Sequence, residues 1–494
     1  MIWTSKHMVR VLAKGGILTP SYLLKILDIV KASGNKHVHF GSRQDVLFQV
    51  SHKHMPTVWD GFEKLQTNYV IHGRNKLHAQ NIVSSYIASD MMAATPWLSS
   101  GNYLYILEHF SYQPVLRVNI VDPKQSLVPL FYGHLNFIAS PVKDYWYLYI
   151  RRNESALPGR WPVLVLSSDI GTLSKKLEEH LVMILDNVSI ADLFSFIQTR
   201  LDYNWRKIEK ELAFEFIPPH EYEGFGKMYN SQNYWAGFFW RNNNYDVSFL
   251  EEVCRLCLQT NISKICLTPW KSFLIKEIQE KDLFQWHRLL GRFGINMHHS
   301  SFELNWHLPL QDQQALRLKR YVIKEFDKVD VCVHGLTFSI KAKPELSFTS
   351  VVIERVPGLK FLKKLDPFVT YKILYAKNFN VNTCQYEEYM PQVPRYRLPQ
   401  ALQELTIKFF AQLQKTSDKQ ANTPKVERVE KHIVHQCQLC FSIYDEKVGD
   451  PSREIAANTP FAKLPDNYCC SLCEAPKADF KVVTMDQLIK TANA

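Results

Sequence analysis

The sequence has no long hydrophobic run and no targeting signal. No stretch reaches the roughly 18 consecutive apolar residues that mark a membrane span. The segment from Met1 to Gly16 lacks the apolar centre and the small-residue cleavage site of a secretory leader. We therefore expect no membrane partner and a protein that stays in the cytoplasm.

The common catalytic signatures are also missing. The chain has no P-loop, no dinucleotide-binding fingerprint and no nucleophile elbow. It has no Lys/Arg run or nucleic-acid motif, so we expect no nucleic-acid partner. His37 and His39 alternate along an expected strand, which indicates a polar face rather than a metal site. With 46% apolar and 22% charged residues among 494, the composition is that of a globular protein of two to four domains.

Charge is unevenly distributed. The chain carries a net +11, but the stretch from Cys437 to Phe480 holds seven acids and four bases, a net −3 that leaves +14 for the rest. The simplest interpretation is solubility. A sharper one is that a basic body receives an acidic module or an anionic ligand.

Cysteine is sparse, with ten in the chain, and four of the ten form two CxxC pairs separated by 29 residues. A CxxC turn directs two thiolates at one centre, so two turns build a tetrahedral four-sulfur cage that suits zinc or a single iron. Four further cysteines lie in apolar segments, and we expect them to be buried, inert thiols: Cys254, Cys257, Cys266 and Cys332.

Residues 433–482 resemble rubredoxin. The resemblance rests on two CxxC motifs and on the segments between and after them: Tyr444-Asp445, Gly449-Asp450-Pro451, Thr459-Pro460-Phe461, Leu464-Pro465-Asp466, Ala475-Pro476-Lys477 and Phe480. It implies one iron that cycles between ferric and ferrous states, with no catalysis at the metal. The implied ligands are Cys437, Cys440, Cys470 and Cys473. We expect iron rather than zinc in function, and an apolar core built by Tyr444, Phe461, Leu464, Tyr468 and Phe480.

The module departs from the rubredoxin pattern after each second cysteine. Rubredoxins usually place glycine there, because the chain turns left-handed, but this chain has Phe441 and Glu474. A non-glycine residue in that conformation costs about 1–2 kcal/mol. Ser471 and Tyr468 replace the usual proline and tryptophan, and Cys469 is a possible competing ligand.

The larger part of the chain contains an internal repeat. Residues 21–47 align without a gap to residues 248–274, at an offset of 227. Each copy is predicted to form helix, turn and strand. In the first helix the apolar residues Leu23, Ile26, Leu27 and Val30 recur at three- and four-residue spacings, which predicts a buried stripe. Thr19-Pro20 should cap the first helix, and Ser248 with Glu251 should form a capping box for the second. Duplication implies a pseudo-two-fold body.

Further elements make this body a mixture of α and β. The apolar patterns predict strands and helices over these ranges: strands 115–121, 145–150, 161–166, 331–334, 336–340 and 348–355, and helices 173–185 and 402–413.

The repeat resembles the ferredoxin-like half-domains of siroheme-dependent nitrite and sulfite reductases, over roughly residues 12–375. The matching segments are Gly41-Ser42-Arg43-Gln44-Asp45, Leu267-Thr268-Pro269-Trp270-Lys271 and Asn81-Ile82-Val83-Ser84-Ser85, with Gln80 where the family has Arg. That family binds an iron–sulfur cluster through four further cysteines. Between residues 275 and 415 this chain has only Cys332 and Cys384, so we expect no iron–sulfur cluster, and siroheme is possible but not expected.

The same resemblance bears on anion binding. Arg43, Arg117, Arg151 and Arg152 could meet carboxylates or an oxyanion. A solvated surface role is the simpler interpretation of each except Arg43, which lies on the family motif.

The expected fold is α+β, a pseudo-two-fold, duplicated nitrite/sulfite-reductase-like body joined by a linker to a small metal-bound rubredoxin-like domain. The expected division is residues 1–190 for the first half, 191–414 for the second, 415–431 for the linker, 432–482 for the rubredoxin-like domain and 483–494 for the tail.

Three functions are compatible with this organisation. The first is an electron carrier rather than an enzyme, with a degenerate body that docks a soluble oxidoreductase of nitrate, nitrite or sulfur metabolism. The second is an oxidoreductase whose body binds a tetrapyrrole and is fed by its own rubredoxin domain. The third is a zinc-stabilised interaction module without redox activity.

Overall fold

A computed structural model describes residues 6–484 apart from 72–77, 93, 153–156, 182–188, 201–202, 215, 220–221, 230, 298, 300–302, 330, 342–346, 357–368 and 422–432. The chain divides into two compact units, residues 1–412 and 413–494. Helix α9 (Leu398–Ala421) continues past this boundary into the expected linker, whose residues 422–431 lie outside the described part.

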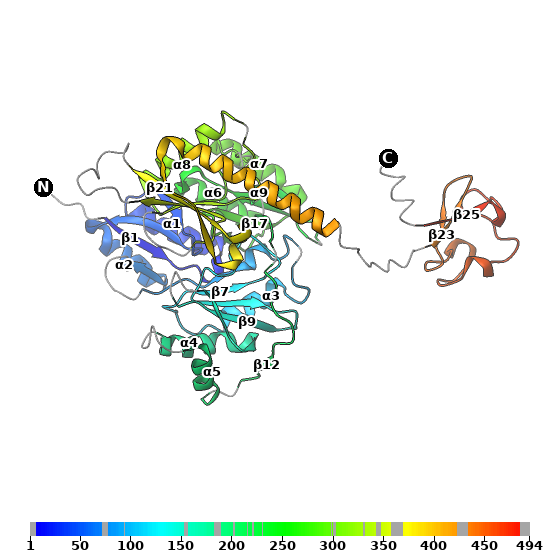
Figure 1. Ribbon diagram of the computed structural model, residues 1–494, viewed down its shortest axis with the longest axis horizontal. Coiled ribbons are helices and arrows are strands. Elements are labelled where there is room, and N and C mark those ends of the chain that lie inside the picture. Colours follow the sequence, from blue (N-terminus) through cyan, green and yellow to red (C-terminus); the bar gives the residue numbers. More distant parts are fainter. Residues whose placement is uncertain are drawn as a thin grey trace. The chain divides into compact units, whose positions relative to one another are not determined.

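The first half of the larger unit pairs a ferredoxin-like domain with an α/β domain (Figure 1). The elements of the ferredoxin-like domain are β1 (Lys6–Val11), β2 (Ile17–Leu18), α1 (Pro20–Ala32), β3 (His37–Phe40), β4 (Val46–Ser51), α2 (Met55–Lys64) and β5 (Tyr69–Ile71). Those of the α/β domain are β6 (Val83–Ser84), α3 (Ser100–Glu108), β7 (Val118–Val121), β8 (Leu135–Ala139), β9 (Tyr145–Ile150), β10 (Gly159–Arg160), β11 (Val163–Leu166), α4 (Ile170–Leu181), α5 (Ile190–Gln198) and β12 (Arg206–Lys207).

The second half repeats this plan. Its ferredoxin-like domain contains β13 (Gly224–Lys227), β14 (Tyr234–Phe238), β15 (Tyr245–Asp246), α6 (Val247–Gln259), β16 (Ile265–Leu267), β17 (Phe273–Ile278) and α7 (Leu283–Phe293). Its α/β domain contains β18 (Trp306–His307), α8 (Gln313–Phe326), β19 (Phe338–Lys341), β20 (Val351–Val356), β21 (Thr370–Ala376), β22 (Tyr386–Pro394) and α9.

The offset of 227 found in the sequence holds in the structure. Adding it to both bounds of α1 gives the bounds of α6, and adding it to those of β4 gives those of β17. The α/β domains match in topology as well: β6, β7 and β8 run parallel before an antiparallel β9, as β18, β19 and β20 do before β21.

The two halves exchange strands reciprocally. Strand β2 of the first half pairs with β16 of the second, and its counterpart β15 pairs with β3 of the first. Helices α1 and α6 lie side by side in Figure 1, and α1 buries its predicted apolar stripe of Leu23, Ile26, Leu27 and Val30 completely. This exchange confirms the pseudo-two-fold body that the repeat predicted.

Several local predictions need correction. The oxygen of Thr19 accepts a hydrogen bond from Tyr22 N at 3.2 Å, as expected, but α6 begins after Asp246, whose carboxylate accepts from Ser248 N at 2.7 Å. The predicted capping box was wrong because Asp is itself a strong N-cap and occupies the repeat position of Thr19.

Residues 331–334 form no strand, and the predicted strand there was wrong. The strand of this region is β19, which begins at Phe338. The helix predicted over 173–185 is α4, which ends at Leu181, and residues 182–185 lie outside the described part.

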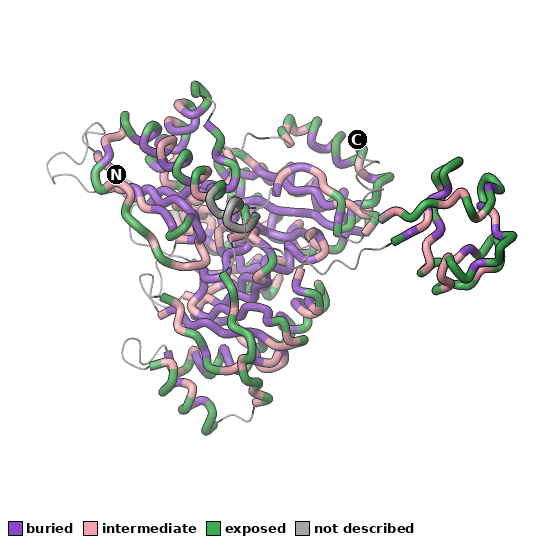
Figure 2. Tube along the Cα trace, turned by 45° about the vertical axis from the view of Figure 1, so that its right-hand side comes forward, coloured by how far each residue is buried: buried purple, intermediate pink, exposed green. Residues whose placement is uncertain are grey.

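Long buried strands form the core of the larger unit, as Figure 2 shows by their purple trace. Helix α9 lies across the sheet that contains β21 (Figure 1), and its Leu402, Leu405 and Phe409 share a core with Ile353 and Ile373. No helix in the described part of the chain is long and apolar enough to cross a membrane.

The smaller unit is built on a three-stranded antiparallel sheet. Its strands are β23 (Ile433–Cys437), β24 (Ile443–Tyr444) and β25 (Phe480–Thr484), with β23 in the centre. The expected tail at 483–494 therefore begins inside β25, and residues 485–494 lie outside the described part.

Candidate metal centre

Two similar turns carry the four CxxC cysteines of the smaller unit. In the first turn, Phe441 N donates to Cys437 O at 3.0 Å and Cys437 N donates to Ser442 O at 2.9 Å. In the second, Glu474 N donates to Cys470 O at 3.0 Å and Cys470 N donates to Ala475 O at 2.8 Å. The first turn follows β23 directly, so the sheet anchors it.

Both turns have the left-handed residue that the sequence predicted. The φ angle is +62° at Phe441 and +60° at Glu474. The turns therefore adopt the glycine-type conformation without glycine, at a conformational cost of about 1–2 kcal/mol each.

The turns bring four sulfur atoms together. The Sγ atoms of Cys437, Cys440, Cys470 and Cys473 all lie within 4.8 Å of one another. The Cys437–Cys473 pair is separated by 3.6 Å and the Cys440–Cys470 pair by 3.5 Å. Cys469 is not part of this group, which is the only one in the described chain in which three or more His, Cys, Asp or Glu side chains come this close.

Hydrogen-bond donors favour the thiolate form of Cys470. Burial alone would raise the pKa of Cys470, but the Ser442 hydroxyl and the backbone amides of Cys473 and Leu472 lower it to about 6. The Ser442 hydroxyl lies 3.0 Å from the Cys470 sulfur and 3.2 Å from the Cys440 sulfur. Sequence reasoning missed Ser442, and its only signal was a hydroxyl residue two positions after Cys440.

Burial of the four cysteines is one-sided. Cys437 and Cys470 are buried, Cys440 is half-buried and Cys473 is exposed. Three exposed apolar side chains belong to the two turns: Leu439 at 66%, Phe441 at 63% and Leu472 at 75%. One edge of the sulfur cluster thus faces solvent beside an apolar rim.

The predicted aromatic core beside the cluster is confirmed. Tyr444, Leu464 and Tyr468 are buried, and Phe461 and Phe480 pack against them. The hydroxyls of the two tyrosines are satisfied, since Tyr444 donates to Thr459 O at 2.8 Å and Tyr468 donates to the Asp450 carboxylate at 2.9 Å. This core fixes the spacing between the two turns.

In the larger unit, the structure gives Arg43 a structural role. Its guanidinium is buried and donates to Asn119 Oδ1 at 2.6 Å and to three backbone carbonyls, those of Asn81 at 2.7 Å, Val118 at 3.0 Å and Tyr132 at 3.2 Å. Both terminal nitrogens thus hold the two domains of the first half together. The anion-binding role expected for Arg43 stays a prediction.

A basic cavity of about 270 Å³ lies beside this arginine. Arg10, Arg117 and Lys271 contribute positive charge to its lining, and Asp45 pairs with Arg10 at 2.8 Å. Arg151 does not line this cavity: it is buried and donates to Phe131 O at 3.3 Å. Arg117 is the one expected arginine besides Arg43 that lines the cavity.

The remaining cysteines form no group of possible metal ligands with other described residues. Cys254, Cys257 and Cys266 are buried, as predicted, and burial raises their pKa values. Cys332 is exposed rather than buried, because the buried side chains of this segment are those of its neighbours Val331 and Val333. Cys384 is half-buried, and burial raises its pKa to about 11.

Comparison with known proteins identifies the family of the smaller unit. A model of the rubredoxin family matches residues 434–480. The rubredoxin HupI of Bradyrhizobium diazoefficiens is 42% identical over 48 residues, which are 10% of this chain and 70% of that protein. The chain belongs to the rubredoxin family through this domain. The rubredoxin HupJ of Rhodobacter capsulatus is 38% identical over 56 residues, 11% of this chain, and the chain spans only 20% of its length.

The body outside the rubredoxin domain is similar to a different group of proteins. A model of the nitrite/sulfite reductase ferredoxin-like half domain matches residues 4–65. The structure of the Mycobacterium tuberculosis NirA protein aligns with a TM-score of 0.62 at 13% identity, covering 81% of this chain and 80% of NirA. The body therefore has a NirA-like fold, and the nitrite/sulfite-reductase-like body expected from the sequence is confirmed.

Proposed function

We propose that this protein is a one-electron carrier that binds a single iron through Cys437, Cys440, Cys470 and Cys473. The sulfur cluster carries the proposal. A tetrahedral site with metal–sulfur bonds of about 2.3 Å has sulfur–sulfur edges of about 3.8 Å, close to the 3.5 and 3.6 Å separations of the two cysteine pairs. The four thiols therefore fit one metal ion with little rearrangement.

Iron bound here would supply a ferric/ferrous couple, as the rubredoxin resemblance implies. The chain's own groups set the conditions for it. The backbone amides of Leu472 and Cys473 and the Ser442 hydroxyl donate to the Cys470 sulfur, which stabilises negative charge on this ligand. Cys437 and Cys470 exclude water from the inner side, and the exposed Cys473 leaves the outer side open to a redox partner.

The apolar rim of Leu439, Phe441 and Leu472 supports docking of a protein partner at this open side, since exposed apolar patches mark interaction surfaces. The proposed partner is a soluble oxidoreductase, and nitrate, nitrite or sulfur metabolism is suggested only by the fold of the body. The body itself is proposed to be a docking module, supported by the net charge of +14 on the chain outside the stretch from Cys437 to Phe480, against −3 for that stretch.

A tetrapyrrole-binding body is the second candidate, favoured by the basic cavity beside Arg43. Its residues fit poorly. The cavity that the described residues form has about 270 Å³, below the range of about 300–1,000 Å³ for sites of drug-sized ligands. Arg43 is already bonded to the protein, and Cys332 and Cys384 cannot supply four thiolates.

Anaerobic purification with metal analysis and an absorption spectrum tests these proposals together. One iron per chain with thiolate-to-iron charge-transfer bands supports the electron carrier. An additional intense Soret band would support the tetrapyrrole-binding enzyme. Zinc alone, from cells supplied with iron, would refute the redox proposal and leave an interaction module.

A further inference from the structure

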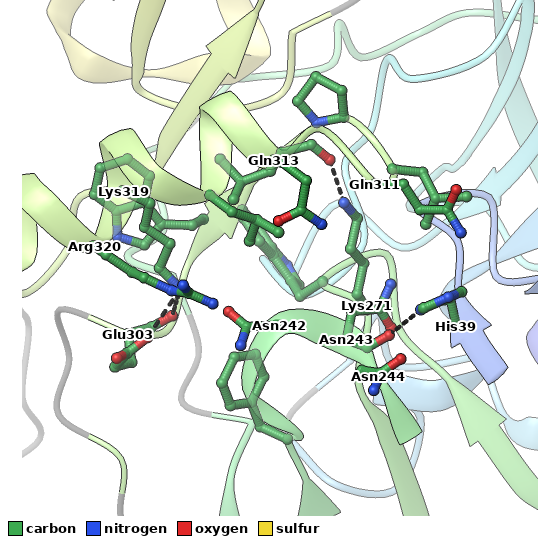
Figure 3. A pocket seen from close by; sticks show the side chains of 17 residues that line it. His39, Asn242, Asn243, Asn244, Lys271, Glu303, Gln311, Gln313, Lys319 and Arg320 are labelled. Atoms are coloured by element: carbon green, nitrogen blue, oxygen red, sulfur yellow. Dashed lines mark hydrogen bonds and ion pairs between the residues drawn. The ribbon is translucent and has the colours of Figure 1, made fainter. Parts of the chain in front are cut away.

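The second half of the body contains a cavity of about 330 Å³ (Figure 3). The loop between β14 and β15 lines one part of it, with Asn242 and Asn244. Helix α8 lines another, with Lys319 and Arg320, and the segment that precedes α8 contributes Glu303. The cavity is larger than the basic one beside Arg43 and neighbours it, since Lys271 and residues 308–310 line both.

The turn that borders this cavity has a counterpart in the first half that is covered by a side chain. The offset of 227 relates Gly15 and Gly16 to Asn242 and Asn243, and all four have a left-handed backbone, with φ angles of +67°, +74°, +65° and +54°. In the first half a Cβ atom at Gly15 would lie 2.4 Å from a methyl of Leu107, so the turn is closely covered there. In the second half the same turn carries asparagine side chains and borders a cavity.

The charges around the cavity leave it positive. Lys319 is buried and donates to the carbonyl of Glu303 at 2.7 Å and to its carboxylate at 3.1 Å, so this pair is internally neutral. Arg320 has no hydrogen bond or ion pair with any residue in the described part of the chain. Figure 3 shows Lys319 and Arg320 on one side of the cavity, Lys271 on the other and the Asn242 amide between them.

The remaining wall is apolar. Trp306, Phe239 and Leu316 line it together with Trp270. Binding sites for small molecules typically combine such a wall with a few convergent polar groups. A guanidinium is well suited to bind a carboxylate or phosphate in bidentate fashion, and side-chain amides add neutral donors.

We infer that this cavity binds an organic anion whose carboxylate or phosphate group is held by Arg320 and Asn242 and whose apolar part lies against Trp306. The site is separate from the sulfur cluster and does not depend on the proposed electron transfer. The anionic group can belong to an organic phosphate or to an organic carboxylate, and binding experiments distinguish these two classes of ligand.

Isothermal titration calorimetry on the full chain tests the site with AMP, succinate and inorganic phosphate. We expect saturable binding of AMP or succinate, the first indicating a phosphate source and the second a carboxylate source. Inorganic phosphate should bind more weakly because it has no apolar part. Arg320→Gln and Asn242→Gly should each weaken binding at least about tenfold. Glycine tolerates φ +65°, so Asn242→Gly keeps the turn.

Two matched variants serve as controls. Arg317→Gln removes an exposed arginine from the same helix that does not line the cavity, and Asn261→Gly replaces another left-handed asparagine elsewhere in the same half. Both should bind like the unchanged protein. The inference is overturned if AMP and succinate give no saturable heat, if inorganic phosphate binds as tightly as both, or if the controls weaken binding as much as Arg320→Gln.

Discussion

Replacing Glu474 tests whether the left-handed turn after Cys473 strains the rubredoxin domain. Glu474 has a φ of +60° and an exposed side chain, and its backbone N–H donates to Cys470 O. Glu474→Gly keeps that hydrogen bond and removes the Cβ that makes the conformation unfavourable. Glu474→Ala removes the same charge and keeps the Cβ, so the comparison between the two variants isolates the backbone effect.

The expected difference is small but measurable. A non-glycine residue in this conformation costs about 1–2 kcal/mol. Replacement by glycine removes this cost, but it also makes the unfolded chain more flexible, which offsets about 0.5–1 kcal/mol of the gain in stability. Glu474→Gly should therefore be more stable than Glu474→Ala by about 0.5–1 kcal/mol. Phe441→Gly should increase the stability less. The side chain of Phe441 is 63% exposed, and burial of its remaining third contributes about 0.5–1 kcal/mol of stability that the variant loses.

The visible thiolate-to-iron absorption reports on this domain alone, so its bleaching in guanidinium under nitrogen measures the effect without interference from the body. Loss of iron makes unfolding irreversible, so the rate of bleaching is the proper measure. We expect Glu474→Gly to bleach about two- to fivefold more slowly than Glu474→Ala. Equal rates, or a faster rate for glycine, would refute the strain argument.

Three further predictions concern the metal and the body. Cys470→Ser should abolish the iron chromophore and Cys469→Ser should leave it intact, as iron content and absorption will show; the opposite result would shift the ligand register by one residue. Glu474→Gln should raise the reduction potential by about 20–90 mV, nearer the low end in salt, because a carboxylate close to the site disfavours the more negative reduced centre; an unchanged potential in low-salt voltammetry would contradict this. A chain ending at residue 421, which keeps α9 whole, should fold, bind no iron–sulfur cluster and reduce neither sulfite nor nitrite with an artificial donor; turnover in that assay would exclude a pure docking role.

The sequence alone was sufficient for features that depend on local pattern. The two CxxC motifs predicted the sulfur cluster, because the turn that each motif forms is built from neighbouring residues. The apolar stripe of α1 and the 227-residue repeat predicted the duplicated body for the same reason. The left-handed φ angles at Phe441 and Glu474 followed from the positions that rubredoxins reserve for glycine.

Other features depend on residues far apart in the chain, and only the tertiary structure decided them. Arg43 lies on a reductase motif, but its guanidinium bonds to carbonyls 38 to 89 residues away, which no local pattern reveals. The reciprocal pairing of β2 with β16 and of β15 with β3 needs both halves folded together. The cavity beside Asn242 exists because packing covers one copy of a repeated turn with Leu107 and leaves the other copy open, and packing of this kind is a property of the folded chain.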